Sequence, residues 1–273
     1  MKVAVCAIAK YENNYIREWV QHYITLGFDN VILYDNNDID GEIFNDVIGD
    51  YIRSNYVILK DKRGEMFNQK EFYNECYKEY SNEYDWIAFF DIDEFLELEY
   101  DDNIKNYLAK DVFKQFDYIR ICWKTYTDNN QIKIIGNNYN CQTRFTEVFD
   151  VYDNENNRRQ KCIYKTKNNE LKLSVHNPIN VLNPCNALGI QELKLGTMLP
   201  HTLWKGCWLN HYLTKSLEEY ISNKCLKHNK LNRKESIYNI YIDRLLDFTS
   251  YWEVNEKTTD KLEYINSIVK NDN

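Results

Sequence analysis

The sequence predicts an α/β protein, because apolar runs that suit buried strands alternate with segments of helical periodicity through the first part of the chain. Four such runs predict strands, at 3–9, 31–34, 56–59 and 86–90. Apolar side chains spaced three and four residues apart predict the helices between them, within 16–24, 43–52 and 65–80. Strands joined by helices pair in parallel, and open sheets of this kind bind ligands at the carboxyl ends of their strands.

The first strand–helix–strand unit has well-defined ends. Residues 3–9 are small or β-branched and apolar, as expected of a strand that is covered on both faces. Gly27 follows the first helix in the position of a left-handed cap residue. The second strand runs into the polar segment 35–38, so Asp35 is expected at the carboxyl end of that strand.

Beyond residue 110 the pattern changes to short apolar runs separated by Asn- and Asp-rich turns. These runs predict additional short strands, at 118–123, 132–135, 142–149, 162–166 and 171–175. From Ser216 the chain is predicted to be helical again, because Ser216 and Glu219 have the spacing of a capping box.

The composition argues against several classes of protein. A formal net charge of −8 does not suit a general nucleic-acid binder, which needs a basic surface. The 8 cysteines show neither a CxxC pair nor the spacing of a zinc site, so we expect free thiols in a reducing cytosol. No apolar run approaches the roughly 20 residues of a membrane span. We expect a cytoplasmic protein, in which the basic run 224–234 is either a solvated face or a peripheral contact with the inner face of the membrane.

The segment 86–95 (WIAFFDIDEF) is the strongest candidate for carrying chemistry. Its five apolar residues form the predicted fourth strand, and Asp91 and Asp93 come directly after it. Carboxylates two positions apart would share one face beyond the strand end. Paired carboxylate oxygens suit Mg²⁺ or Mn²⁺, particularly when substrate phosphates complete the coordination shell. The alternative is a pair of solvated carboxylates without a metal.

Several motifs occur in order along the chain: AIAKYEN at 7–13, IREW at 16–19, LGF at 26–28, YDNND at 34–38, the segment 86–95 and NHYLTKSLEEY at 210–220. Together they resemble the bacterial glycosyltransferases related to family ninety-two and the broader family-two-like clan. The resemblance is dense over residues 1–100, thin from 110 to 205, and returns at 207–224.

This resemblance implies a GT-A fold, which is a Rossmann-like nucleotide-sugar-binding fold with a mixed central sheet and C-terminal helices. We therefore expect a single catalytic domain over 1–213, followed by a helical extension over 214–273. Within the catalytic domain, residues 1–100 would bind the nucleotide and residues 101–213 the acceptor.

The resemblance also implies roles for the carboxylates. An Asp-x-Asp pair in such enzymes holds a divalent ion, usually Mn²⁺, that bridges the donor diphosphate. Asp93 would be the direct ligand, and Asp91 would reach the ribose or a metal-bound water. Asp35 would contact the nucleobase of the donor, which is often uracil. The remaining donor contacts implied in this half are Ala9, Lys10, Glu12, Gln69 and Ile92.

Two residues near the end of the expected catalytic domain extend this donor site. Several GT-A enzymes add a late His as a metal ligand with a Lys on the diphosphate, which His211 and Lys215 would supply here. Lys215 precedes a predicted helix N-terminus, so its ammonium and free backbone N–H groups could converge on phosphate. His176 is a lesser candidate ligand, with a structural role as the equal alternative.

The function implied is transfer of a hexose, with galactose guessed, from a UDP-sugar to a hydroxyl of an oligosaccharide or lipid-linked glycan in polysaccharide biosynthesis. Inversion at the anomeric carbon would need a carboxylate base on the acceptor side. The candidates are Asp128 and Glu147, and each is as well explained as a turn or strand-edge carboxylate. The sequence departs here from the family, whose corresponding loop is commonly rich in Gly and Ser.

Two other functions compete with this one. Phosphotransferases and phosphatases can also end an apolar strand in Asp-x-Asp, but their nucleophile usually follows the first strand, and here the pair follows the fourth. A catalytically weak protein of the same fold, binding a nucleotide or a glycan, is the second alternative.

Overall fold

A computed structural model describes residues 1–149, 159–166, 171–180, 183–191, 204–220, 222, 260–261, 263–264 and 267. The chain packs into two compact units, of which the first is formed by Met1–Thr125 with Glu155–His211 and the second by Tyr126–Asn154 with Tyr212–Asn273. The described strands all belong to the first unit, so its sheet positions the residues of interest.

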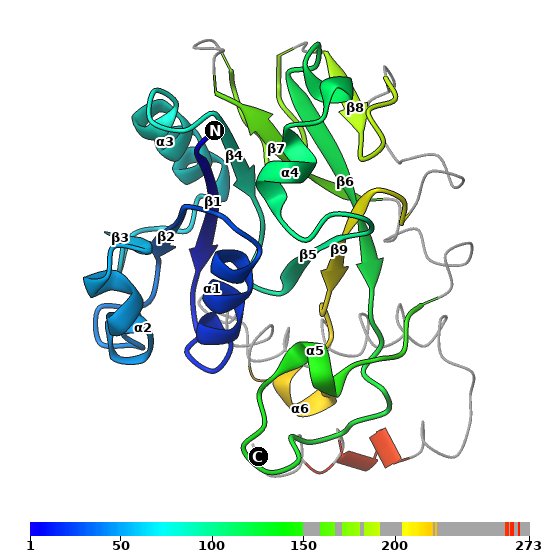
Figure 1. Ribbon diagram of the computed structural model, residues 1–273. Helices are drawn as coiled ribbons and strands as arrows, with labels where there is room; N and C mark the ends of the chain where they lie inside the picture. Colours follow the sequence, from blue (N-terminus) through cyan, green and yellow to red (C-terminus); the bar gives the residue numbers. More distant parts are fainter. Residues whose placement is uncertain are drawn as a thin grey trace. The chain divides into compact units, whose positions relative to one another are not determined.

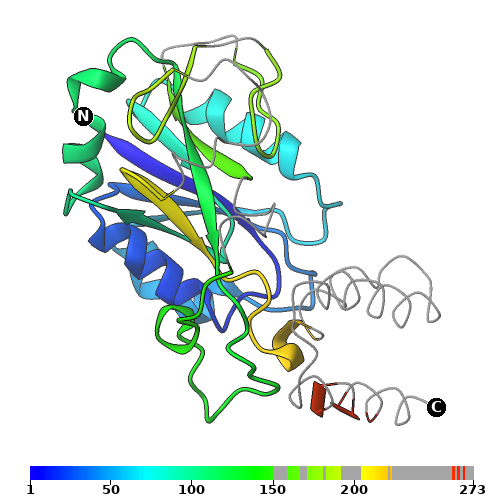
Figure 2. The same ribbon diagram turned by 90° about the vertical axis from the view of Figure 1, so that its right-hand side faces the viewer.

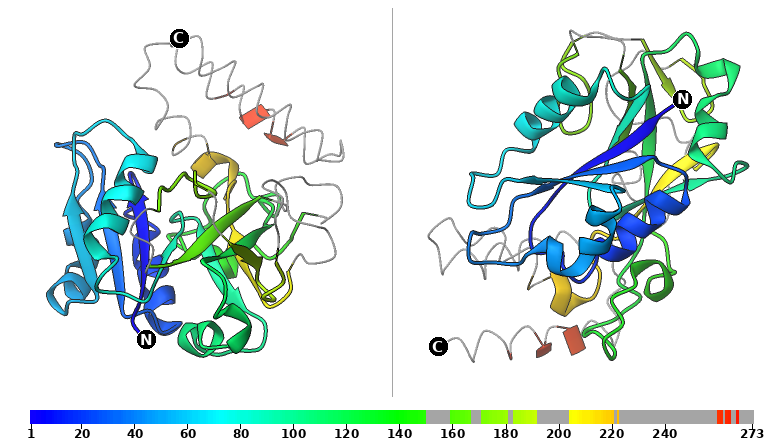
Figure 3. Two further views of the ribbon diagram at one scale, coloured as in Figure 1. Left: turned by 90° about the horizontal axis from the view of Figure 1, so that it is seen from above. Right: turned by 60° about the vertical axis from the view of Figure 1, so that its left-hand side comes forward.

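The first part of the sheet is parallel and follows the predicted alternation (Figure 1). Its strands are ordered β3-β2-β1-β4, with bounds β1 Val3–Ala9, β2 Asn30–Asp35, β3 Val57–Asp61 and β4 Trp86–Phe89. The connecting helices are α1 Ile16–Thr25, α2 Phe44–Arg53 and α3 Gln69–Tyr80. Helix α3 lies on one face of these strands and α1 and α2 lie on the other (Figure 3).

Burial of apolar side chains on both faces explains this arrangement. Every residue of β1 is buried, as the uninterrupted apolar run predicts. On the face covered by α3, Phe72, Tyr73 and Cys76 pack in one cluster with Cys6 of β1. Asn68 caps that helix, because its side-chain oxygen accepts a hydrogen bond from Glu71 N at 3.2 Å.

The second part of the sheet makes it mixed, as predicted. Strand β7 is antiparallel to β4 and to β6, and β9 pairs in parallel with β6 and antiparallel with β5. Figure 2 shows β9 in yellow between β6 and β5. The bounds are β5 Glu94–Leu98, β6 Tyr118–Thr125, β7 Gln160–Lys165, β8 Pro184–Asn186 and β9 Cys207–His211. Helix α4 (Ile104–Leu108) and a 3₁₀ turn (Asp111–Phe113) lie between β5 and β6 in sequence.

Three predicted strands beyond β6 are wrong. Residues 171–175 form no strand and make one isolated bridge, Leu173 with Pro178. Residues 132–135 form bends and loop, and the segment 142–149 overlaps helix α5 (Cys141–Arg144) and a loop that makes one isolated bridge, Tyr126 with Val148. Asn140 caps α5, since its side chain accepts a hydrogen bond from Thr143 N at 3.0 Å. A local capping interaction therefore outweighs the weak alternation of this segment.

The second unit contains α5 and α6 (Leu217–Tyr220), which Figure 1 shows close together. Arg144 of α5 contacts Glu219 of α6 through a buried ion pair of 2.6 Å. Ser216 N donates to Glu219 Oε2 at 3.0 Å and Glu219 N donates to Ser216 Oγ at 3.3 Å, which confirms the predicted capping box.

Some predictions fall outside the described residues. The basic run 224–234 and most of the predicted helical extension over 214–273 lie there. Among the described residues, no helix is long and apolar enough to cross a bilayer. The cysteines that the structure describes are all buried free thiols.

Candidate functional site

The predicted donor residues of the first half meet at one edge of the sheet. In the parallel register, Ala9 pairs with Asp35 and Cys6 pairs with Phe89. The segments that follow β1, β2 and β4 therefore leave the sheet on the same side. This edge receives Lys10 and Glu12 after β1, Asp35 at the end of β2, and the Asp-x-Asp pair after β4.

A tight turn carries Asp91 and Asp93. Asp91 N donates to Glu94 Oε2 at 2.8 Å, and Glu94 N donates back to Asp91 O at 3.1 Å. Trp19 of α1 then donates its indole N–H to both Asp91 O and Glu94 O, each at 2.9 Å. Because Trp19 is fully buried, helix α1 fixes the backbone of the turn on which both carboxylates depend.

The Asp91 carboxylate is held by three side chains. Its Oδ1 accepts hydrogen bonds from Gln69 at 2.6 Å and from the Tyr73 hydroxyl at 3.2 Å, and its Oδ2 lies 2.7 Å from Lys161 Nζ. Desolvation is the largest influence on the pKa of Asp91 and raises it, but the positive charge of Lys161 holds that pKa below its ordinary value. Gln69, predicted as a donor contact, thus lies against the motif.

Asp93 faces His211 of β9. The Asp93 Oδ1 and His211 Nε2 atoms lie 3.7 Å apart, and both side chains are buried. Pairing of Glu94 with His211 in the β5–β9 ladder produces this approach. The His211 Nδ1 atom is buried and, within the described part of the chain, has no hydrogen-bond partner, while the Trp123 ring centroid lies 4.3 Å from the imidazole.

Asp93 and His211 together fit a divalent ion whose coordination shell would be completed by substrate. Two metal–ligand bonds of about 2.1 Å can span about 4.2 Å between ligand atoms, so one ion can bridge Asp93 Oδ1 and His211 Nε2. No group of three or more His, Cys, Asp or Glu in a metal-binding arrangement occurs among the described residues. The remaining coordination positions would therefore fall to phosphate and water, which is how such ions are commonly held beside nucleotides.

A buried polar network surrounds Asp35 at this edge of the sheet. Asp35 Oδ1 accepts hydrogen bonds from the backbone and side-chain nitrogens of Asn37, at 3.0 and 2.8 Å. Asn37 in turn accepts a hydrogen bond from Tyr11 N at 2.8 Å. Burial raises the pKa of Asp35, and the Asn37 hydrogen bonds oppose that shift. Asn37 and Tyr11 thus orient Asp35, a role that sequence reasoning did not assign.

The other predicted residues after β1 surround this network. Lys10 Nζ lies 2.9 Å from Asp38 Oδ1, and the Tyr11 hydroxyl also donates to Asp38. This hydrogen bond raises the pKa of Tyr11 to about 12. Tyr11 adopts a left-handed backbone conformation with φ 57°. Glu12 is buried, and its carbonyl accepts the hydrogen bonds that start α1.

Two further predicted residues contribute through the backbone or the core. Ala9 is buried and pairs with Asp35 in the ladder. Ile92, between the two motif carboxylates, is only 3% exposed.

His176, the lesser candidate ligand, lies in the first unit, where its Nδ1 contacts Gln160 O at 3.0 Å and burial lowers its pKa. Its ring faces Trp123, at a centroid distance of 5.6 Å.

Three predicted residues belong to the second unit. Lys215 is buried there and has a left-handed φ of 53°. The backbone N–H groups that follow it are not free for phosphate, because Leu217 N donates to Gln131 O and Glu218 N donates to Ile132 O. Of the candidate bases, Asp128 is buried in an ion pair with Lys261 at 2.6 Å.

Glu147, the other candidate base, is exposed within the second unit. Its backbone N–H donates to the Asn129 side chain at 3.1 Å, and its carbonyl accepts from Thr127 N at 2.8 Å. The role of either residue as the base stays a prediction.

Sequence reasoning missed Lys161, Trp19 and Glu94 as parts of this site. Lys161 lies in β7 but directly precedes the predicted strand 162–166, so the prediction left this cation outside the sheet. Glu94 is three residues after Asp91, a spacing at which a carboxylate can close a turn on a backbone N–H. Nothing in the local pattern distinguishes Trp19 from an ordinary core residue.

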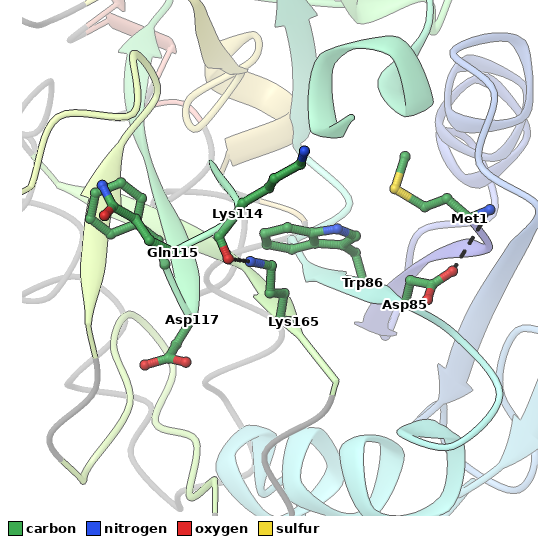
Figure 4. A pocket seen from close by; sticks show the side chains of 8 residues that line it. Met1, Asp85, Trp86, Lys114, Gln115, Asp117 and Lys165 are labelled. Carbon is green, nitrogen blue, oxygen red and sulfur yellow. Dashed lines mark hydrogen bonds and ion pairs between the residues drawn. The ribbon is translucent and has the colours of Figure 1, made fainter. Parts of the chain in front are cut away.

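A hollow also opens at the other end of β4, as Figure 4 shows. It has a volume of about 460 Å³ and is lined by Trp86, Lys114 and Lys165 among others. Lys165 Nζ is already bound to the carbonyls of Phe113 and Lys114, each at 2.7 Å. This hollow lies at the amino end of the strand, away from the motif carboxylates, and holds none of the predicted residues.

Comparison with known proteins connects the chain to one family. The model described as Glycosyltransferase family 92 matches residues 1–245. A family 92 protein of Oryza sativa subsp. japonica is 27% identical over 112 residues, which cover 40% of this chain and 19% of that protein. An Arabidopsis thaliana family 92 protein is 28% identical over 94 residues, which cover 34% of this chain and 16% of that protein. The match thus spans less than a fifth of these relatives' length.

Solved structures also resemble the chain. Staphylococcus aureus TarS 1-349 in complex with UDP-GlcNAc has a TM-score of 0.40 and 12% identity, over 94% of this chain and 78% of that one. Mannosyltransferase PcManGT from Pyrobaculum calidifontis, in complex with GDP-Man and Mn²⁺, has a TM-score of 0.34 and 11% identity. That match covers 44% of this chain and 35% of the mannosyltransferase chain. Because the family model matches most of its length, the chain belongs to glycosyltransferase family 92.

Proposed function

We propose that this chain is a metal-dependent glycosyltransferase that transfers a hexose from a UDP-sugar to a hydroxyl of a surface glycan, with inversion. Galactose is the sugar that family analogy suggests. The observation that carries the proposal is the convergence of Asp35, the Asp91–Asp93 turn and His211 at one edge of a single sheet. Membership of family 92 supports the reaction class.

The nucleoside end of the donor would lie against Asp35. This carboxylate is buried and oriented by Asn37, so it can accept a hydrogen bond from the imide of uracil with little loss of side-chain entropy. Ala9, Lys10 and Glu12 flank the same edge. The ammonium of Lys10 adds positive charge beside the phosphates, although Asp38 partly offsets it.

The metal would be held by Asp93 and His211. A metal held by these two residues would supply positive charge to offset the negative charge that develops on the leaving nucleotide. An imidazole ligand favours Mn²⁺ over Mg²⁺. Asp91 and Gln69 keep the turn in place, and the buried Ile92 side chain anchors it to the core.

The acceptor side of the proposal rests on the family resemblance. The acceptor would be an oligosaccharide or a lipid-linked glycan, and Asp128 or Glu147 would take the proton of its hydroxyl. We keep the proposal of a catalytic domain over 1–213 with a helical extension over 214–273. A cytoplasmic location, with peripheral membrane contact through 224–234, remains part of it.

A thermal-shift panel tests the donor class. Purified protein is heated with Mn²⁺ and UDP-, GDP- or CMP-sugars, and nucleotide release is then measured with the best stabiliser. The proposal expects stabilisation by UDP-sugars together with release of UDP. Stabilisation by GDP- or CMP-sugars alone would contradict the role of Asp35, and UDP binding without any release would favour a binding protein of the same fold.

A further inference from the structure

Lys161 is a fully buried cation beside the metal-binding turn. It lies on β7, with a side chain that is 0% exposed. Its Nζ is 2.7 Å from Asp91 Oδ2 and 6.0 Å from the centroid of the Tyr73 ring. Lysine is almost never fully buried without a charged partner, because leaving water costs an ammonium several kcal/mol. Asp91 is the partner that offsets this cost.

Charge balance explains why the cation is tolerated. Asp91, Asp93 and Glu94 bring three carboxyl groups to one turn. Burial lowers the pKa of Lys161, but the charges of Asp91 and Glu94 outweigh burial and raise that pKa overall. For Glu94, burial is the largest influence and raises the pKa of the carboxyl group well above its ordinary value. The turn therefore pairs a fully buried lysine with an aspartate whose side chain is 33% exposed.

Several contacts restrain Asp91, although its side chain is 33% exposed. Its Oδ2 is engaged by Lys161, and its Oδ1 is engaged by Gln69 and Tyr73. Its backbone N–H and carbonyl are bound as well, by Glu94 and Trp19. Turning this carboxylate toward an ion held by Asp93 would leave the fully buried Lys161 ammonium without its partner carboxylate. Removal of one partner of such a pair is strongly unfavourable.

We propose that Lys161 is a positioning residue that holds Asp91 outside the metal's coordination shell, so that Asp93 and His211 alone are the protein ligands. The inference rests on the metal site of the proposed function. It has a second consequence, because a fixed positive charge near the ion repels it. Lys161 therefore also weakens metal binding, which keeps the ion exchangeable with the departing nucleotide.

Metal affinity separates this role from a merely structural one. Mn²⁺ binding is measured by electron paramagnetic resonance of free Mn²⁺ in the presence of UDP, and transfer is measured in parallel. In Lys161→Met, we expect Mn²⁺ to bind about tenfold tighter, because one positive charge is lost, while transfer falls about tenfold. Lys161→Arg keeps the charge and should retain the wild-type Mn²⁺ affinity within about threefold. Loss of structure alone would weaken binding and transfer together.

Asp91→Asn and the double variant Lys161→Met/Asp91→Asn complete the test and remain informative if Lys161→Met does not fold. Asp91→Asn leaves Lys161 uncompensated and should weaken Mn²⁺ binding about tenfold. The double variant removes both charges, and its Mn²⁺ affinity should return to within about threefold of wild type. Loss of Mn²⁺ binding in the double variant would overturn the inference, because Asp91 would then be a ligand.

Two further results would also contradict the inference. If the Lys161→Met protein folds and binds Mn²⁺ no more tightly than wild type, then Lys161 does not repel the ion. If the wild-type protein binds no Mn²⁺ in the presence of UDP, the proposed metal site itself is wrong. This outcome is distinguishable from failure of the Lys161 inference, because it is measured on the wild-type protein alone.

Discussion

His211 Nε2 lies 3.7 Å from Asp93 Oδ1, although the two residues are far apart in the sequence. Their approach depends on the pairing of β5 with β9, in which Glu94 is opposite His211. The strand that begins directly after the motif therefore brings in a histidine from the far end of the same unit. The two proposed metal ligands, one oxygen and one nitrogen, therefore meet at the carboxyl edge of the sheet, where the donor diphosphate is proposed to bind.

Replacement of Asp93 tests the proposed ligand directly. Asp93→Asn keeps the size of the side chain but removes its charge, so we expect transfer to fall by roughly 100- to 1,000-fold, as when a charge-stabilising group is removed from an active site. The matched control is Glu97→Gln, which removes an exposed carboxylate from β5. Steady-state rates for both variants provide the measurement. Equal activity of Asp93→Asn and Glu97→Gln would rule Asp93 out as a ligand.

Replacement of His211 should change metal preference. Without the imidazole nitrogen, the site keeps only oxygen ligands, which suit Mg²⁺ as well as Mn²⁺. For His211→Gln we expect Mn²⁺ affinity to fall by about 10- to 100-fold and the ratio of Mn²⁺- to Mg²⁺-supported activity to fall with it. His176→Gln is the control, since His176 contacts Gln160 O and not Asp93. A shift of the metal ratio in His176→Gln instead would reassign the histidine ligand.

The Trp19 indole should stabilise both the fold and the motif. Trp19→Phe removes the donor shared by Asp91 O and Glu94 O and leaves a small cavity. We expect the free energy of unfolding to fall by about 2–3 kcal/mol. The KM for the donor should also rise. Tyr77→Phe, which removes a hydrogen bond to Lys165 O, should lower stability without changing KM. Urea denaturation and donor titration of the two variants separate these effects.

His22 should make stability depend on pH under mildly acidic conditions. Burial lowers the pKa of His22 to about 4, and its neutral ring donates a hydrogen bond from Nε2 to Leu96 O at 2.9 Å. Between about pH 6.5 and 4 the unfolded chain binds a proton that the folded chain does not. The contribution of His22 to stability is therefore complete above about pH 6.5 and is lost as the pH falls, by up to about 3 kcal/mol.

The His22 prediction is checked by comparing two proteins. Urea denaturation from pH 7 to 4 should show a steeper loss of stability for wild type than for His22→Gln. The difference between the two curves isolates His22 from other titrating groups. Parallel curves would contradict the assigned pKa.

The sequence predicted the first half of the fold well, for physical reasons. Buried parallel strands need long apolar runs, and the helices that cover them need an apolar stripe, so both patterns are visible locally. The edge carrying Asp35, Asp91 and Asp93 follows from this topology. The capping box at Ser216 was equally visible, because its interactions span only three residues.

The rest depended on contacts that no local pattern records. The segment 142–149 was predicted as a strand, but Asn140 and the α5 turn give it a different structure. Strands β5 and β9 are short and were not predicted, although their pairing brings His211 to Asp93. Lys161 reaches Asp91 only because β7 lies beside β4 in the sheet. Long-range strand pairing therefore decides which side chains complete the site.

Metal dependence of UDP release is the most direct test of the account. Protein is first treated with EDTA, then supplied with a UDP-sugar found by the thermal-shift panel, and UDP release is followed before and after excess Mn²⁺ is added. The account predicts that release stops in EDTA and returns with Mn²⁺, and that Asp93→Asn does not recover. Full release of UDP in EDTA would contradict it.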